Sequence, residues 1–178
     1  AVFATMGLTG SLASSNIYLL EKIAISVILA VSLSMVVGFL GELSLGHAGF
    51  MCVGAYLGGK VAVLLVPIFG NGIITLVISL IVGGAVAALC GFIIGLPALR
   101  LRGDYLAIVT LAFGEIVKSV FMNSSRESFG GSLGLDTPRY SKDTLFIIAF
   151  VLVLLCLAAV QNIIRSKHGR AITAIRDN

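Results

Sequence analysis

The chain contains long apolar segments that suit the interior of a lipid bilayer. A membrane-spanning helix needs roughly 20 mainly apolar residues, because each residue adds about 1.5 Å across a hydrocarbon core of about 30 Å. The segments Ile23–Leu40, Ile73–Leu99 and Leu145–Ile164 meet this requirement, and Ser44–Phe69 and Tyr105–Met122 meet it less fully. We therefore predict about five transmembrane helices.

The composition excludes a soluble domain. Hydrophobic residues make up 58% of the chain and charged residues 11%, whereas a soluble domain carries about 25% charged residues. A β-barrel would alternate in polarity, which segments such as "IIAFVLVLLCLAAV" do not do. We predict an all-α polytopic membrane protein, with residues 1–178 forming a single transmembrane domain in the lipid bilayer. Most of the residues that give the net charge of +4 lie between the spans. They are therefore explained by orientation in the membrane, and no nucleic-acid partner is expected.

The positive residues predict how the chain is oriented in the membrane. Lys and Arg in short loops prefer the cytoplasm, which places the basic segment Arg165–Asn178 inside. Counting back one span places residues 123–143 in an extracytoplasmic loop, where the charges of both signs are balanced. One span further back, Arg100 and Arg102 lie inside as topological anchors, although a salt bridge to a partner is an alternative role.

Small residues recur every four positions along Ile73–Leu99. This spacing places them on one helix face, where missing side chains allow a neighbouring helix to approach. The pattern predicts a helix-packing face rather than a ligand site. The residues are Gly83, Ala87, Gly91 and Gly95.

The segment Gly38–Lys60 is rich in glycine and also holds Ser44 and His47. Short, glycine-interrupted apolar segments are typical of discontinuous transporter helices, so we expect a broken or re-entrant helix near residues 44–60. For His47 three roles remain open: an interface or capping residue bonded to backbone, a pathway or substrate contact, or a metal ligand. The last is disfavoured because no second ligand lies at metal-binding spacing.

Glu115 lies deep within the span Tyr105–Met122. A carboxylate there is costly and almost always faces a bundle interior or a water-filled cavity. Lys118 follows three residues later on the same face, so an internal ion pair is one explanation. The other is that Glu115, with Thr110 nearby, lines a translocation pathway.

The sequence contains no catalytic or nucleotide-binding constellation and no metal-binding motif. The glycine-rich segment Phe129–Leu135 lacks the following Lys-Ser/Thr of a phosphate-binding loop, and there is no HExxH. Cys52, Cys90 and Cys156 all lie within apolar segments, so we interpret them as packing residues. We expect no enzymatic activity and no cofactor bound by this chain.

Three segments together resemble one known family. "GFLGELSLGHAGFMCVGAY", "GLPALRLRGDYLAIVTLAFGEI" and "RSKHGRAITAIRDN" are similar in order and spacing to motifs of LivM-type permeases. These are inner-membrane subunits of ATP-binding cassette (ABC) importers for branched-chain amino acids in the bacterial plasma membrane. The resemblance covers nearly the whole chain.

The resemblance implies partners and site residues. The partners are a homologous LivH-type permease subunit, two cytoplasmic ATPases that use ATP, and an extracytoplasmic substrate-binding protein. The implied pathway residues are Ser44, Gly46, His47, Gly49, Thr110 and Glu115. Residues 165–178 would begin the cytoplasmic loop that couples to an ATPase, with Arg165, Gly169, Arg170, Ile175 and Arg176 in its motif.

The resemblance also implies that the chain is part of a longer protein. In the family the coupling loop continues into further spans, so we expect this chain to be the N-terminal half to two thirds of a permease. Two alternative functions stay open. One is an ABC permease for urea or short amides, and the other is a passive channel or structural membrane subunit.

Overall fold

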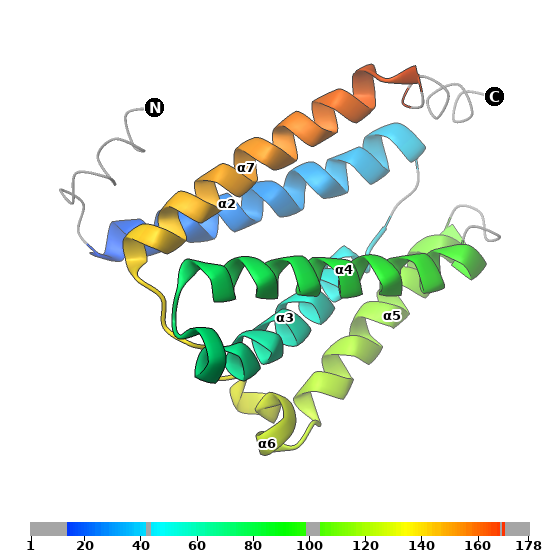
Figure 1. The fold of residues 1–178 in the computed structure, drawn as a ribbon. Coiled ribbons are helices and arrows are strands. Elements are labelled where there is room, and N and C mark those ends of the chain that lie inside the picture. Colours follow the sequence, from blue (N-terminus) through cyan, green and yellow to red (C-terminus); the bar gives the residue numbers. More distant parts are fainter. Residues whose placement is uncertain (1–13, 42–43, 99–103, 168, 170–178) are drawn as a thin grey trace. The chain divides into compact units, whose positions relative to one another are not determined.

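A computed structural model describes residues 14–41, 44–98, 104–167 and 169 (Figure 1). Every regular element in these residues is helical, and no strand occurs among them. The elements are α2 (Ser14–Met35), the π-helix η1 (Val36–Leu40), α3 (His47–Phe69), α4 (Ile73–Ala98), α5 (Asp104–Met122), α6 (Arg126–Phe129), the 3-10 helix η2 (Gly131–Leu133) and α7 (Lys142–Arg165).

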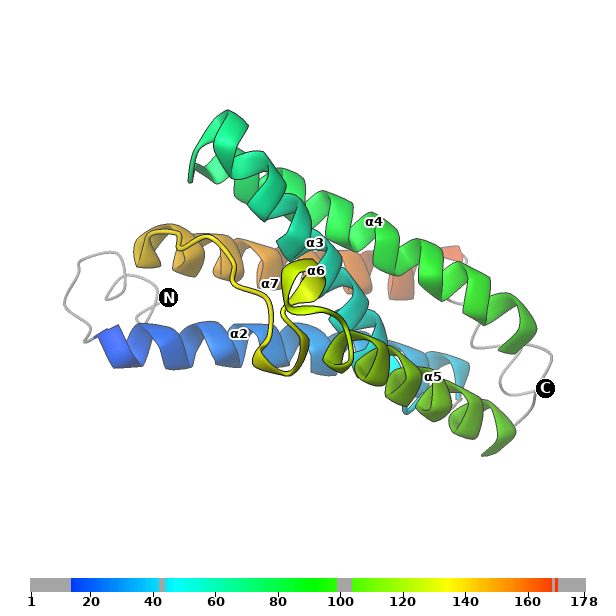
Figure 2. The ribbon, with the colours of Figure 1, turned by 90° about the horizontal axis from the view of Figure 1, so that it is seen from below.

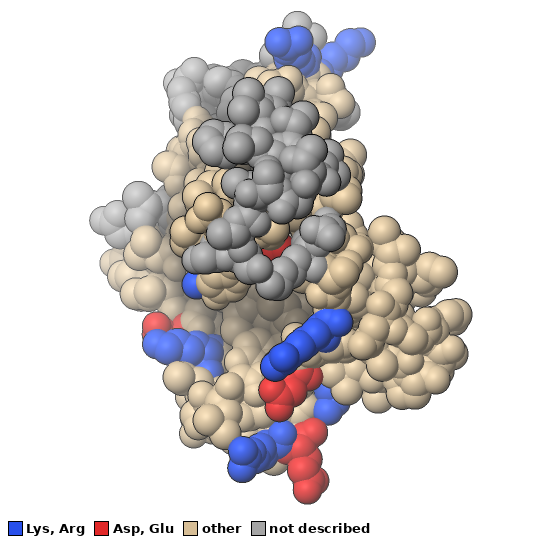
Figure 3. Space-filling model, turned by 90° about the vertical axis from the view of Figure 1, so that its left-hand side faces the viewer, with Lys and Arg blue, Asp and Glu red and all other residues tan. Residues whose placement is uncertain are grey.

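Five of the helices are long and apolar enough to cross a membrane, as the sequence predicts. The spans are Asn16–Gly38, His47–Phe69, Ile73–Pro97, Tyr105–Met122 and Thr144–Arg165. The first begins before the predicted Ile23, because the helix continues through Glu21 and Lys22. Among the described residues visible in Figure 3, most carry no charge, and the Lys, Arg, Asp and Glu side chains form small separate groups.

The chain divides into two compact units, Ala1–Gly41 with Tyr140–Asn178, and Glu42–Arg139. The first unit is a pair of helices, α2 and α7, that pack along each other. Ile17 and Phe146 are buried in this pair. α2 continues into the π-helix η1, which ends at Gly41. The φ of Gly41 is 70°, in the left-handed region that favours glycine.

The second unit is built on a tight hairpin of α3 and α4 (Figure 2). At the closest point, a Cβ atom on Gly83 would lie 2.6 Å from the Gly54 carbonyl oxygen and 3.1 Å from the Gly58 Cα. The helix backbones therefore touch directly. The spacing of Gly54 and Gly58, four residues apart, is the α3 counterpart of the predicted small face on α4.

Three of the four small residues predicted to form a packing face on α4 lie beside α3. Gly83 and Ala87 lie against Gly54, and a Cβ on Gly91 would lie 3.8 Å from the Phe50 ring. Gly95 is different, because a Cβ there would meet no described atom within 4 Å. The four-residue repeat therefore extends past the α3 contact.

The break expected within residues 44–60 is not confirmed. α3 is one continuous helix from His47 to Phe69, and its glycines provide close packing rather than an interruption. The non-helical backbone lies before the helix, at Ser44–Gly46. Tertiary contact explains this, since a close helix–helix approach offsets the roughly 1 kcal/mol that each glycine costs a helix.

Helix α5 packs on the other side of α3, and its outer end leads into α6 and η2. A core of Val53, Val117 and Phe121 joins α3 to α5. Cys52 and Cys90 pack against this core, which agrees with their predicted role. Tyr56 stacks on Phe121 with ring centroids 4.3 Å apart.

Candidate functional site

The segment before α3 lies directly against the middle of α5. A Cβ on Gly46 would be 2.1 Å from the Thr110 carbonyl oxygen, and a Cβ on Gly49 would be 2.9 Å from the Gly114 Cα. These distances leave no room for any side chain at Gly46 or Gly49. The family resemblance implied that both segments lie near a pathway, and the structure brings three of the implied residues close together: Gly46, Gly49 and Thr110.

Thr110 closes this contact with two hydrogen bonds. Its hydroxyl accepts a bond from the Leu45 backbone N–H at 3.2 Å and donates one to the Ala107 carbonyl at 3.0 Å. Thr110 is buried, with 7% of its surface exposed. Leu45 precedes α3, so its N–H has no helical carbonyl to bond, and the threonine hydroxyl supplies the partner that the backbone needs.

Thr110 lies within the candidate membrane span Tyr105–Met122. α5 begins at Asp104, so Thr110 is about 9 Å along the helix at about 1.5 Å per residue. Near the same contact, the Phe50 ring of α3 packs against the Phe113 ring of α5, with centroids 4.7 Å apart. Irregular backbone at this depth is tolerated only where it is buried in protein or lines a water-filled cavity.

The remaining predicted residues of this region surround the contact. Ser44 is half-buried in the non-helical segment, and His47 is half-buried as the first residue of α3. His47 therefore sits at the helix N-terminus, one residue from the glycine that touches Thr110. The choice between its capping and pathway roles stays open.

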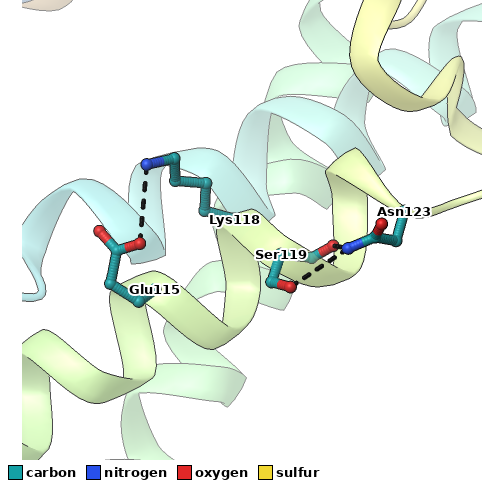
Figure 4. Close-up of polar contacts among 4 residues, drawn as sticks. All are labelled: Glu115, Lys118, Ser119 and Asn123. Atoms are coloured by element: carbon teal, nitrogen blue, oxygen red, sulfur yellow. Dashed lines mark hydrogen bonds and ion pairs between the residues drawn. The ribbon is translucent and has the colours of Figure 1, made fainter.

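Glu115 forms an ion pair with Lys118 (Figure 4). At 3.6 residues per turn it lies about 140° around α5 from Thr110. The Lys118 Nζ and the Glu115 Oε2 are 3.6 Å apart, and the two side chains are 60% and 66% exposed. The predicted pair is thus present. The expectation that α5 is interior is met on the Thr110 face only, because no described residue covers the Glu115 face.

That outer face continues to the end of α5 with further polar groups. The Asn123 amide donates to the Ser119 carbonyl at 2.9 Å and to the Ser119 hydroxyl at 3.2 Å. Together Glu115, Lys118, Ser119 and Asn123 form a polar stripe, which we call the α5 stripe. Sequence reasoning identified its first two members and missed the last two, although their spacing of i, i+4 and i+8 from Glu115 marks one helix face.

The predicted ATPase-coupling segment is described only at its start. Arg165 is exposed at the end of α7. Gly169 is buried, and its N–H bonds to the Ser166 hydroxyl at 3.1 Å. Arg170, Ile175 and Arg176 lie outside the described residues.

Two other features were missed from the sequence. One is the attachment of Lys60 to the α6 loop, which is developed below. The other is an apolar cavity of about 190 Å³ between α2 and α7, bordered by Glu21 and Phe150. In the described part of the chain, no group of three or more His, Cys, Asp and Glu side chains could hold a metal ion.

Comparison with known proteins identifies the family. Residues 15–178 match the family described as branched-chain amino acid transport system / permease component. The LivM permease proteins of the high-affinity branched-chain amino acid transport systems of Escherichia coli and Salmonella typhimurium are each 36% identical over 185 residues. These alignments cover 86% of this chain and 42% of each relative.

A more distant relative is the probable branched-chain amino acid transport permease protein LivM of Methanocaldococcus jannaschii. It is 29% identical over 124 residues, covering 63% of this chain and 34% of the relative. No solved structure matches the chain. The chain spans about two fifths of the length of the relatives it matches. On this evidence it belongs to the branched-chain amino acid transport permease family, as an all-helical, multi-pass protein of the inner membrane.

Proposed function

We propose that this chain is part of a permease subunit of an ABC importer that carries branched-chain amino acids across the plasma membrane. The names of the two bacterial relatives support this substrate class. The proposed subunit is non-catalytic, binds no cofactor, and depends on ATP hydrolysis in a partner chain.

The contact of Gly46 with Thr110 is the observation that carries the proposal. Here non-helical backbone meets a helix at membrane depth, and a threonine hydroxyl bonds the Leu45 N–H. The contact itself is closed, but it fixes the start of α3 at this depth, and a helix N-terminus offers backbone N–H groups to a carboxylate in otherwise apolar surroundings. A zwitterion with a hydrocarbon side chain fits these surroundings.

The α5 stripe supports a pathway on the uncovered side of the same helix. A lipid-facing Glu115 and Lys118 would be costly even as a pair, so water or another protein must cover them. We propose that a homologous LivH-type subunit faces this stripe across the pathway. The cytoplasmic segment from Arg165 would lead to one of two ATPases, and the loop at residues 123–143 would face a substrate-binding protein outside.

The test is uptake of radiolabelled leucine by cells that carry or lack the full-length gene. Isoleucine, valine and urea serve as competitors, and a second set of cells is depleted of ATP. We expect high-affinity leucine uptake that needs the gene and ATP and is blocked by isoleucine and valine. Competition by urea instead would favour an amide permease, and flux that survives ATP depletion would favour a passive channel.

Glu115→Gln tests the stripe in the same assay. We expect reduced leucine uptake with unchanged amounts of protein in the membrane, because the amide keeps the size of the side chain and removes its charge. Ser34→Ala on α2 is the control, since it removes a polar group outside the second unit. Wild-type uptake by Glu115→Gln would assign the ion pair a structural role only.

A further inference from the structure

The loop after α5 is bonded to the middle of α3. The Lys60 ammonium donates to the Glu127 carbonyl at 3.1 Å and to the Ser128 carbonyl at 2.7 Å. The Phe129 ring packs edge-on against Tyr56, with centroids 6.5 Å apart. One end of the loop is therefore held at the level of residues 56–60.

The other end of the loop is held at the same level. A Cβ on Gly59 would lie 2.9 Å from the Leu135 Cδ2 and 3.2 Å from the Thr137 Cγ2. In Figure 2, α6 lies beside α3 well short of the end of that helix. Three separate contacts thus place the whole segment 126–137 against residues 56–60.

Helix α3 continues well beyond this level. Val61–Phe69 is entirely apolar and rises about 13 Å at about 1.5 Å per residue. The polar turn Gly70–Gly72 follows, and α4 then returns with a second apolar segment. The outer end of the hairpin exposes large apolar side chains, with Ile68 71% and Leu64 63% exposed.

On the α4 side of this polar turn, both polar side chains of the hairpin end are bonded to backbone carbonyls. The Thr75 hydroxyl donates to the Gly70 carbonyl and the Ser79 hydroxyl to the Leu76 carbonyl. Apolar side chains exposed on two adjacent helices require lipid rather than water. We therefore expect the hairpin to leave the membrane at its polar turn, where the candidate span Ile73–Pro97 of α4 begins.

The level of the loop can be read along α4 as well. Gly58 touches the backbone at Ser79, which lies about 9 Å inward from the start of α4 at Ile73 at about 1.5 Å per residue. Both helices thus place the loop about 10 Å below the membrane boundary, somewhat less if the hairpin is tilted.

The loop nevertheless carries exposed charges. They are Arg126, Glu127, Asp136 and Arg139, and no ion pair joins them within the described residues. Charged groups at membrane depth need water or a partner. We propose that residues 124–139 form the floor of a water-filled recess, sunk about 10 Å below the end of the α3–α4 hairpin. This proposal rests on the proposed function only for the side of the membrane, which would be the outer one.

The test compares two spin-labelled cysteines in the full-length protein reconstituted in lipid nanodiscs. Cys52, Cys90 and Cys156 are first replaced by Ala. Glu127→Cys reports on the loop and Ile68→Cys on the hairpin end. Collision with oxygen marks lipid, and collision with a water-soluble nickel chelate marks water.

We expect the label at 127 to collide mainly with the nickel chelate and the label at 68 mainly with oxygen. Water access at both positions would place the hairpin end outside the membrane and overturn the recess. Collision mainly with oxygen at position 127 would show that the loop faces lipid, and it would refute a water-filled recess. Both measurements are independent of transport activity, so a failure of leucine uptake leaves them interpretable.

Sidedness is measured separately, by labelling Glu127→Cys in intact cells with a membrane-impermeant maleimide. Labelling from outside is the expected result and places the recess on the substrate-binding side. Labelling only in inverted vesicles would overturn the outer placement. The collision measurement with oxygen and the nickel chelate still tests the recess in that case. An incorrect side of the membrane and an absent recess therefore give different results.

Discussion

The backbone contact between α3 and α4 can be tested with two adjacent glycines. A Cβ on Gly83 would lie 2.6 Å from the Gly54 carbonyl oxygen and 3.1 Å from the Gly58 Cα, whereas a Cβ on Gly84 would meet nothing within 4 Å. Gly83→Ala and Gly84→Ala therefore add the same methyl group to the same helix, on different faces. Only the first should disturb the packing of the hairpin.

The magnitude follows from the two distances. Non-bonded heavy atoms in contact prefer about 3.5 Å, so the helices must part by roughly 0.4–0.9 Å, which forfeits about a quarter to a half of the dispersion energy at the contact. Overpacking of this kind costs about 1–3 kcal/mol. Both variants gain up to about 1 kcal/mol of helix propensity. That gain cancels in the comparison, so Gly83→Ala should be about 1–3 kcal/mol less stable than Gly84→Ala.

The assay is unfolding of the purified full-length protein in mixed micelles, with helix content followed by circular dichroism as the fraction of denaturing detergent rises. We expect Gly84→Ala to unfold at or above the wild-type midpoint and Gly83→Ala below it. Equal midpoints for the two variants would refute the backbone contact, because helix propensity alone would then account for both.

Further predictions concern the polar contacts. Thr110→Val should leave the Leu45 N–H without its partner, at a cost of about 1–3 kcal/mol. Hydrogen exchange at the Leu45 amide should therefore accelerate roughly tenfold or more, while Thr110→Ser should retain the slow rate; an unchanged rate in the valine variant would contradict the bond. Lys60→Met should free the loop, so that a spin label at Glu127 gains mobility, and Lys60→Arg should keep it restrained. A label equally restrained in Lys60→Met would show that the ring and glycine contacts hold the loop without the ammonium.

The five spans could be predicted from the sequence because their signal is local. About 20 consecutive apolar residues have few stable environments other than a bilayer, whatever their neighbours in space. Gly83 and Ala87 were found in the same way, since the four-residue spacing defines a helix face before any partner is known. The same spacing extended to Gly95, where the partner helix has already ended.

The interruption expected near residues 44–60 shows where local signals become insufficient. Glycine lowers helix propensity and also allows close packing, and these two effects predict opposite structures. α3 is continuous because α4 packs beside Gly54 and Gly58, a contact that the sequence does not show.

The sequence by itself determined the class of protein, its spans and its family, because these depend on hydropathy and on motifs read along the chain. Only the tertiary structure decided that Gly46 touches Thr110, that the face of Glu115 is uncovered, and that Lys60 holds the α6 loop below the end of the hairpin. The contacts of Thr110 with the segment before α3 and of Lys60 with the α6 loop join residues more than 60 positions apart. Their formation depends on how the helices pack, which no short segment specifies.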